Sequence, residues 1–254
     1  MSTISNNDLI NYLMYPADNV MILGQRLGEW CGHGPVLEQD IALTNIALDL
    51  IGEARNFYQY AAELSDDGKT EDYFPYQRDV RQFRNVLLTE MPNGHWGDTL
   101  MRQFMFDCFH YFYLSALKSS IDTRLSAIAA KSFKEVSYHL RFSSEWIVRL
   151  GDGTEDSHQK MQQSLNELMP YFDELFCPDE LENKMAHSGI APQLKDFEDN
   201  AREKFENTVS KAMLKLPSDV FAQKGGKSGY HTEHMGFILA ELQYMQKSYP
   251  GCEW

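Results

Sequence analysis

Residues 125–150, LSAIAAKSFKEVSYHLRFSSEWIVRL, are the most informative stretch of the chain, because they contain neither proline nor glycine. An uninterrupted stretch as long as residues 125–150 predicts one helix that crosses a whole domain. On a wheel of about 100° per residue, one set of residues falls within about 40° of a single line, and we expect this stripe to face the core. The stripe consists of Leu125, Ala129, Ser132, Val136, Leu140, Ser143, Ile147 and Leu150.

Two polar residues, Glu135 and His139, stand beside this stripe. In helical bundles that hold a pair of carboxylate-bridged metals, two helices each supply a Glu and the other two each supply a Glu-x-x-His motif. The residue three positions before His139 is Val136, and Glu135 lies about 100° from the stripe centre. Because Lys131 is one turn away on the same side, we interpret Glu135 as the partner of Lys131 and not as a metal ligand.

Composition limits the possible classes of protein. The 254 residues include few glycines and prolines and show no alternating strand pattern, which predicts a single all-α domain over residues 1–254. Four cysteines without a Cys-x-x-Cys pair, and an N-terminus that is neither basic nor apolar, indicate a reduced, cytoplasmic protein. The net charge of −14 and the lack of a long apolar run argue against nucleic acid and membrane partners.

The second predicted helix runs roughly from Val36 to Leu64. It is apolar on almost all sides, which predicts a position inside a bundle. Asn45, Asp49 and Glu53 recur along it at a spacing of four, with Arg26 and Arg55 near in sequence. Asn56 stands where a Glu-x-x-His motif starting at Glu53 would need its histidine, and residues 36–64 contain no histidine at all.

The third long helix, about Asp98 to Leu117, contains Asp107 and His110 at helical spacing. This pair is the best metal-like motif in the chain, but a dinuclear site needs two such sets, so we favour a buried Asp107–His110 hydrogen bond. The remaining predicted elements are a short helix from Arg78 to Leu88 and helices near residues 158–176 and 193–215, separated by a link around Pro178.

A glycine- and lysine-rich segment, residues 223–230, precedes His231-Thr-Glu-His234 and a final amphipathic helix that ends near Lys247. Lys224 and Lys227 offer a weak alternative as phosphate-binding residues, although the segment lacks the phosphate-loop motif. His231 and His234 offer a further alternative as two ligands of one metal ion. The simpler interpretation is a flexible connector in which Thr232 caps the helix.

Five long strings are more specific than any of these motifs. They are QRLGEWCGH (25–33), NIALDLIGEARNFYQYAAEL (45–64), MPNGHWGDT (91–99), KEVSYHLRFS (134–143) and HTEHMGFILAELQYMQ (231–246). Together they extend along the whole chain, which resembles the C subunit of the multicomponent phenylacetyl-CoA epoxidase, the ring 1,2-oxygenase of aerobic phenylacetate breakdown.

The resemblance implies a ferritin-like helical bundle that acts as a non-catalytic structural subunit. The family's A subunit holds the di-iron centre, and a flavin and iron–sulfur reductase supplies electrons from NADPH. We therefore expect a cytoplasmic hetero-oligomer with the A subunit as direct partner, the reductase as an indirect one, and no catalytic, cofactor-binding or metal-binding residues in this chain.

On this interpretation, a set of polar residues forms a filled-in former metal site, held by hydrogen bonds and by cations such as Lys131 or Arg55. These residues are Asp49, Glu53, Asp107, His110, Glu135 and His139. Two alternatives stay open. One is a di-iron or di-manganese oxidase that uses Asp107, His110, Glu135 and His139, and the other is an acyl-CoA-binding module built on Lys224, Lys227 and His231.

Overall fold

The computed structural model describes residues 4–252, and over this range the secondary structure is helical, with no strand. The predicted all-α class is therefore confirmed. Packing divides the chain into two compact units. Unit 1 comprises Met1–Glu90 and Gly225–Trp254, and unit 2 comprises Met91–Lys224. That the whole chain forms one domain stays a prediction.

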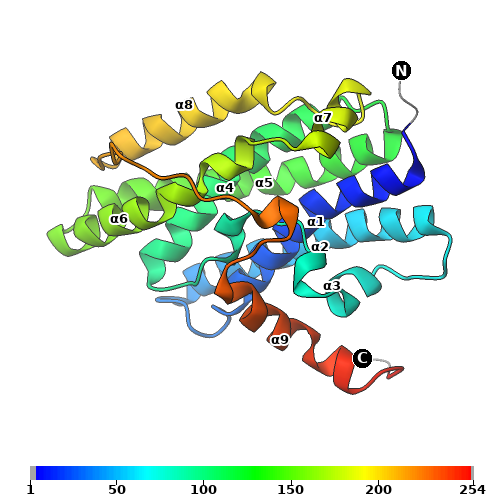
Figure 1. The fold of residues 1–254 in the computed structure, drawn as a ribbon. Helices are drawn as coiled ribbons and strands as arrows, with labels where there is room; N and C mark the ends of the chain where they lie inside the picture. Colours follow the sequence, from blue (N-terminus) through cyan, green and yellow to red (C-terminus); the bar gives the residue numbers. More distant parts are fainter. Residues whose placement is uncertain (1–3, 253–254) are drawn as a thin grey trace. The chain divides into compact units, whose positions relative to one another are not determined.

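Unit 1 is built on a long helix pair, α1 (Asn6–Gly28) and α2 (Leu37–Ser65), which lie side by side (Figure 1). A capping box formed by Ser5 and Asp8 starts α1. The two backbones approach closely at Gly24, where an added Cβ would lie 3.0 Å from Ile51 and 3.2 Å from the carbonyl oxygen of Ala47. A larger residue at this position would push the pair apart.

The remaining elements of unit 1 are α3 (Tyr73–Gln77), η1 (Val80–Gln82), η2 (Leu87–Glu90) and α9 (Glu233–Ser248). The single helix predicted from Arg78 to Leu88 is wrong, because this segment forms two short 3₁₀ turns with non-helical backbone between them. Side chains of α1 explain the difference. The N–H of Arg84 donates to Asp18 at 2.8 Å and that of Val86 donates to Asn19 at 2.8 Å, so neither is available to a helix.

Asp18 is also the centre of the buried charge in unit 1. Its carboxylate is fully buried and accepts hydrogen bonds from the Tyr58 hydroxyl at 2.6 Å and from the guanidinium of Arg78. Burial, followed by the negative charge of Asp18, raises the pKa of Tyr58 well above its ordinary range. This network ties α1, α2 and the segment after α3 together.

Unit 2 is built on a second long pair, α4 (Trp96–Leu117) and α5 (Thr123–Gly151). The helix predicted over residues 125–150 is confirmed, and its predicted core stripe is buried except at Leu150, which is half-buried. The other elements are α6 (Glu155–Leu168), η3 (Met169–Tyr171), η4 (Asp173–Phe176), α7 (Glu180–His187) and α8 (Lys195–Lys211). Helix α7 lies in the predicted link around Pro178, where a capping box of Asp179 and Glu182 starts it.

The prediction that α2 is buried on almost all sides is wrong. Leu43, Ile46, Leu50 and Phe57 are fully buried, but three other apolar residues are not. The exposed fractions are 71% for Leu37, 51% for Ile41 and 61% for Leu48. Helix α2 therefore has one core-facing side and one apolar side in solvent. In the described part of the chain, no helix is long and apolar enough to cross a membrane.

Candidate functional site

A fully buried polar cluster of unit 2 lies between α4 and α5 and is centred on Asp107. The Gln103 amide donates to one carboxylate oxygen at 2.7 Å, and the Ser143 hydroxyl donates to the other at 2.7 Å. All three side chains are fully buried. The sequence placed Ser143 on the core stripe but did not single out Gln103, although a Gln four residues before an Asp on one helix is a recognisable hydrogen-bonding pair.

Two histidines, His110 and His139, complete the surroundings of Asp107, and each is 1% exposed. Burial is the main cause of a raised pKa for Asp107, which moves from its ordinary value of 3.8 to about 6. The positive charge that His139 and His110 can carry, and the hydrogen bonds from Ser143 and Gln103, oppose this shift. The raised pKa of Asp107 therefore means that the surrounding hydrogen bonds and charges compensate only in part for the water that its carboxylate loses on burial.

The burial predicted for Asp107 and His110 is confirmed, whereas the hydrogen bond between them stays a prediction. The two oxygens of the carboxylate accept from Gln103 and Ser143, and the His110 ring packs on Phe106 with 5.0 Å between ring centroids. One of these donors is on α4 and the other is on the neighbouring helix. The sequence motif placed Asp107 and His110 on one helix face but did not indicate these partners.

The arrangement does not fit a dinuclear metal centre. Val136 is fully buried at the position where a Glu-x-x-His motif ending at His139 would need its carboxylate. The two oxygens of Asp107 accept hydrogen bonds from Gln103 and Ser143, which are not the Glu and His side chains that build such a site. Among residues 4–252, no group of three or more His, Cys, Asp or Glu side chains is arranged to hold a metal ion.

The structure divides the six predicted polar residues between the two units. Asp107, His110, Glu135 and His139 belong to unit 2, whereas Asp49 and Glu53 lie on α2 in unit 1. Arg55 forms an ion pair with Glu71 at 3.1 Å. Lys131 is exposed and Glu135 is half-buried, and their predicted pairing stays a prediction.

A second buried polar cluster, in unit 1, attaches the segment before α9. Glu90 is fully buried, and its carboxylate lies 2.6 Å from Nδ1 of His231 and accepts from the N–H and hydroxyl of Thr232 at 2.8 and 2.7 Å. Asn85 donates to the same carboxylate at 3.0 Å. Thr232 thus occupies the N-cap position, but the predicted cap is wrong, because its hydroxyl binds Glu90 and not the helix.

The glycine-rich segment packs closely on the chain before η2. An added Cβ at Gly226 would lie 2.0 Å from the carbonyl oxygen of Asn85, so only glycine fits. Lys227 is 9% exposed, and the His231 ring is tied to Glu90 and to the carbonyl oxygen of Phe83. Two of the three residues of the predicted acyl-CoA module therefore have little surface to offer a ligand.

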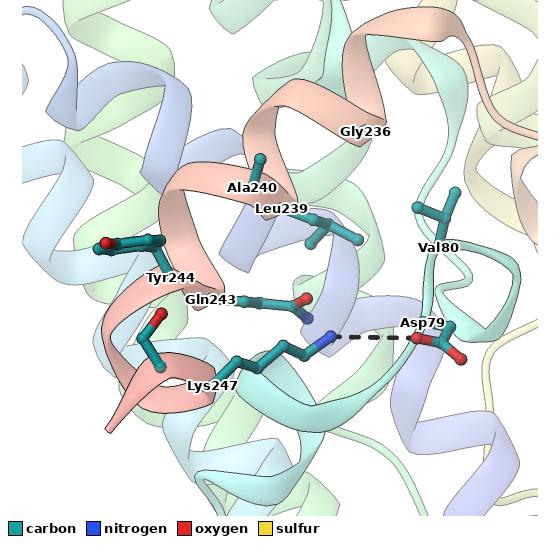
Figure 2. Close-up of a pocket in the computed structure, with 9 residues that line it drawn as sticks. Asp79, Val80, Gly236, Leu239, Ala240, Gln243, Tyr244 and Lys247 are labelled. Carbon is teal, nitrogen blue, oxygen red and sulfur yellow. Dashed lines mark ion pairs between the residues drawn. The ribbon is translucent and has the colours of Figure 1, made fainter. Parts of the chain in front are cut away.

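A shallow groove of about 350 Å³ runs along α9 beside Asp79 and Val80 (Figure 2). The small residues Gly236 and Ala240 line it on the helix, and Lys247 reaches toward Asp79 with 3.9 Å between their charged atoms. An ion pair this long and exposed contributes little stability. The groove contains none of the residues that the sequence singled out as ligands.

Two long helix pairs and the all-helical architecture place the chain among helical-bundle proteins. The chain belongs to the phenylacetic acid catabolic protein family, whose sequence model matches residues 1–254. It is 47% identical over 248 residues to the C subunit of 1,2-phenylacetyl-CoA epoxidase from Escherichia coli strain K12, and the match covers 98% of this chain and 100% of that relative. The resemblance identified from the five strings is confirmed, and the all-helical architecture is consistent with a ferritin-like bundle.

Proposed function

We propose that this chain is a non-catalytic structural subunit of a phenylacetyl-CoA epoxidase complex, and that it binds and supports the di-iron A subunit. Its work is to hold the catalytic partner in its active arrangement in the cytoplasm, while the reductase delivers electrons to that partner. Aerobic phenylacetate catabolism is the process in which the complex acts. The family membership and the epoxidase relative from Escherichia coli support this proposal.

The single observation that carries the non-catalytic role is the chemistry around Asp107. Val136 places an apolar side chain where a bridging carboxylate would be needed, and Gln103 and Ser143 engage both oxygens of Asp107. Oxygen activation at paired metals requires several carboxylate and histidine ligands with open coordination positions. Hydrogen bonds take the place of such ligands here, which suits a scaffold.

The test is reconstitution of the epoxidase with variants of this chain that remove the remaining candidate ligands. The combined Asp107→Asn and His139→Gln variant should bind the A subunit and support epoxidation within about two-fold of wild type, because a scaffold contributes no group to the reaction. Loss of epoxidation with the complex still intact would contradict the proposal.

A metal measurement separates the proposal from the oxidase alternative. The purified chain is incubated anaerobically with ferrous iron or manganese, desalted, and analysed for metal. We expect no stoichiometric metal. Close to two metals per chain, lost in the Asp107→Asn variant, would contradict the proposal and support the oxidase alternative.

A further inference from the structure

The outer face of α2 carries a line of apolar side chains that are exposed in the described part of the chain. Leu37, Ile41 and Leu48 are 71%, 51% and 61% exposed, and Val36, just before the helix, is 48% exposed. Their spacing of four and then seven residues places the three helical residues on one side of α2. We call residues 36, 37, 41, 48 and 52 the α2 stripe. Exposed apolar side chains that gather on one side of a helix mark interaction sites.

Gly52 continues the α2 stripe by one turn beyond Leu48. Glycine in a helix interior destabilises the helix relative to alanine. Nothing lies within 4 Å of a Cβ added at Gly52, so packing within the described chain does not explain the glycine. A bare backbone on an exposed apolar stripe allows another helix to approach closely.

The length of the α2 stripe fits a helix as its occupant. From Leu37 to Gly52 the stripe extends over about 22 Å at about 1.5 Å per residue. This length corresponds to about four helical turns along which a partner helix can pack. The helical members of the stripe stand four or seven residues apart, as residues do along the seam of two packed helices.

The charged residues beside the α2 stripe indicate which kind of partner helix would pack on it. Glu38 and Asp40 lie on the first turn beside Leu37, and the cation of Arg55 is engaged by Glu71. The N–H of Gly34 donates to Asp40 and lowers the pKa of that carboxyl, which therefore stays ionised at neutral pH. A second copy, whose net charge over the whole chain is also −14, offers no excess of cations, so charge complementarity favours a basic surface on a different protein.

We propose that the α2 stripe is the docking surface for a helix of the catalytic subunit, and that this helix presents an apolar seam flanked by Lys or Arg. This inference rests on the proposed function and names the surface through which it operates. Leu48 and Gly52 form its C-terminal half, where a large exposed side chain and a bare backbone position stand one turn apart.

The test measures the affinity of the A subunit for Leu48→Asp and Gly52→Leu variants of this chain. Leu48→Asp places a charge in the seam, and Gly52→Leu fills the open space while it favours the helix. Each should weaken binding by at least about 30-fold. Gly52→Leu should leave the thermal unfolding temperature of the isolated chain unchanged or higher, so its loss of binding would not come from misfolding. The matched control is Phe221→Asp, which alters a residue of unit 2 that is 83% exposed and should bind like wild type.

The charge of the partner is tested separately. Glu38→Lys should slow association and weaken its dependence on salt, whereas Glu206→Lys, an exposed change on α8, should do neither. Equal effects of the two changes would overturn the assignment of a basic flank.

The outcomes distinguish the inference from the function on which it rests. No binding of wild-type chain to the A subunit would overturn the proposed function. Wild-type affinity in both Leu48→Asp and Gly52→Leu would overturn only the docking surface. Equal loss in Phe221→Asp would also overturn it, and so would a wild-type homodimer that Leu48→Asp dissociates without affecting binding of the A subunit.

Discussion

Among single residues, Asp107 is a buried carboxyl that two neighbouring side chains hold by hydrogen bonds. Its two oxygens accept from Gln103 and Ser143, yet burial still raises its pKa to about 6. The protonated form is therefore favoured by folding. Because the pKa in the folded protein exceeds the unfolded value, stability is lost progressively as the pH rises from the unfolded value through the folded one, and the full cost remains above both.

This shift gives a prediction for Asp107→Asn. The change in pKa from 3.8 to about 6 corresponds to about 3 kcal/mol, which wild type loses progressively as the pH rises from about 4 to about 7. The variant has no such ionisation. The difference in unfolding free energy, variant minus wild type, should increase over this range and become constant above it. Urea denaturation at a series of pH values measures the difference, and parallel profiles for the two proteins would contradict the prediction.

Glu90 illustrates a buried carboxylate with a different task. It binds His231 and Thr232 directly before α9, so we expect Glu90→Ala to loosen that helix at a cost of about 3 kcal/mol, because the partners keep buried polar groups without a counterpart. Hydrogen exchange should accelerate in residues 233–248 and stay unchanged in α4 and α5. Glu233→Gln, on the exposed first turn of α9, is the control.

Among the elements, two glycines of unit 1 show opposite requirements. Gly226 leaves only 2.0 Å between an added Cβ and the carbonyl oxygen of Asn85, whereas nothing lies within 4 Å of a Cβ added at Gly236 on α9. The first holds a segment against its neighbour, and the second is a helix position with free space.

Alanine substitutions should separate these roles. Gly226→Ala should destabilise the protein by about 2 kcal/mol or more, because the backbone must shift. Gly236→Ala should stabilise it by up to about 1 kcal/mol through helix propensity. Thermal and urea unfolding measure both changes. A neutral Gly226→Ala would show that the segment is less closely held than the contact with Asn85 indicates.

For the molecule as a whole, stability should depend on the protein partner and not on metal. A ligand that binds only the folded state stabilises it by about 2.7 kcal/mol when present at about 100 times its dissociation constant. The A subunit should therefore raise the unfolding temperature of this chain. Ferrous iron or manganese, added anaerobically at the same excess, should leave it unchanged. A metal-dependent increase that Asp107→Asn abolishes would contradict the scaffold role.

Local pattern was sufficient to predict the all-α class, the long helices and the core stripe of α5, because periodic apolar residues without proline or glycine favour helices regardless of their neighbours. It was also sufficient for the family, since long strings such as NIALDLIGEARNFYQYAAEL are too specific to recur by chance. Spacing along one helix was likewise sufficient to see that Val136, and not a carboxylate, stands three residues before His139.

The partners of each polar residue, in contrast, depend on how the helices pack. Gln103 and Ser143 bind Asp107 because α4 and α5 bring them together, and the N–H groups of Arg84 and Val86 bind α1 in place of completing a helix.

The sequence pattern also did not predict which side of α2 is exposed. Leu37 and Ile46 are both apolar residues of one helix, yet the first is 71% exposed and the second is fully buried. Burial depends on which neighbours cover a face, and local periodicity does not encode those neighbours.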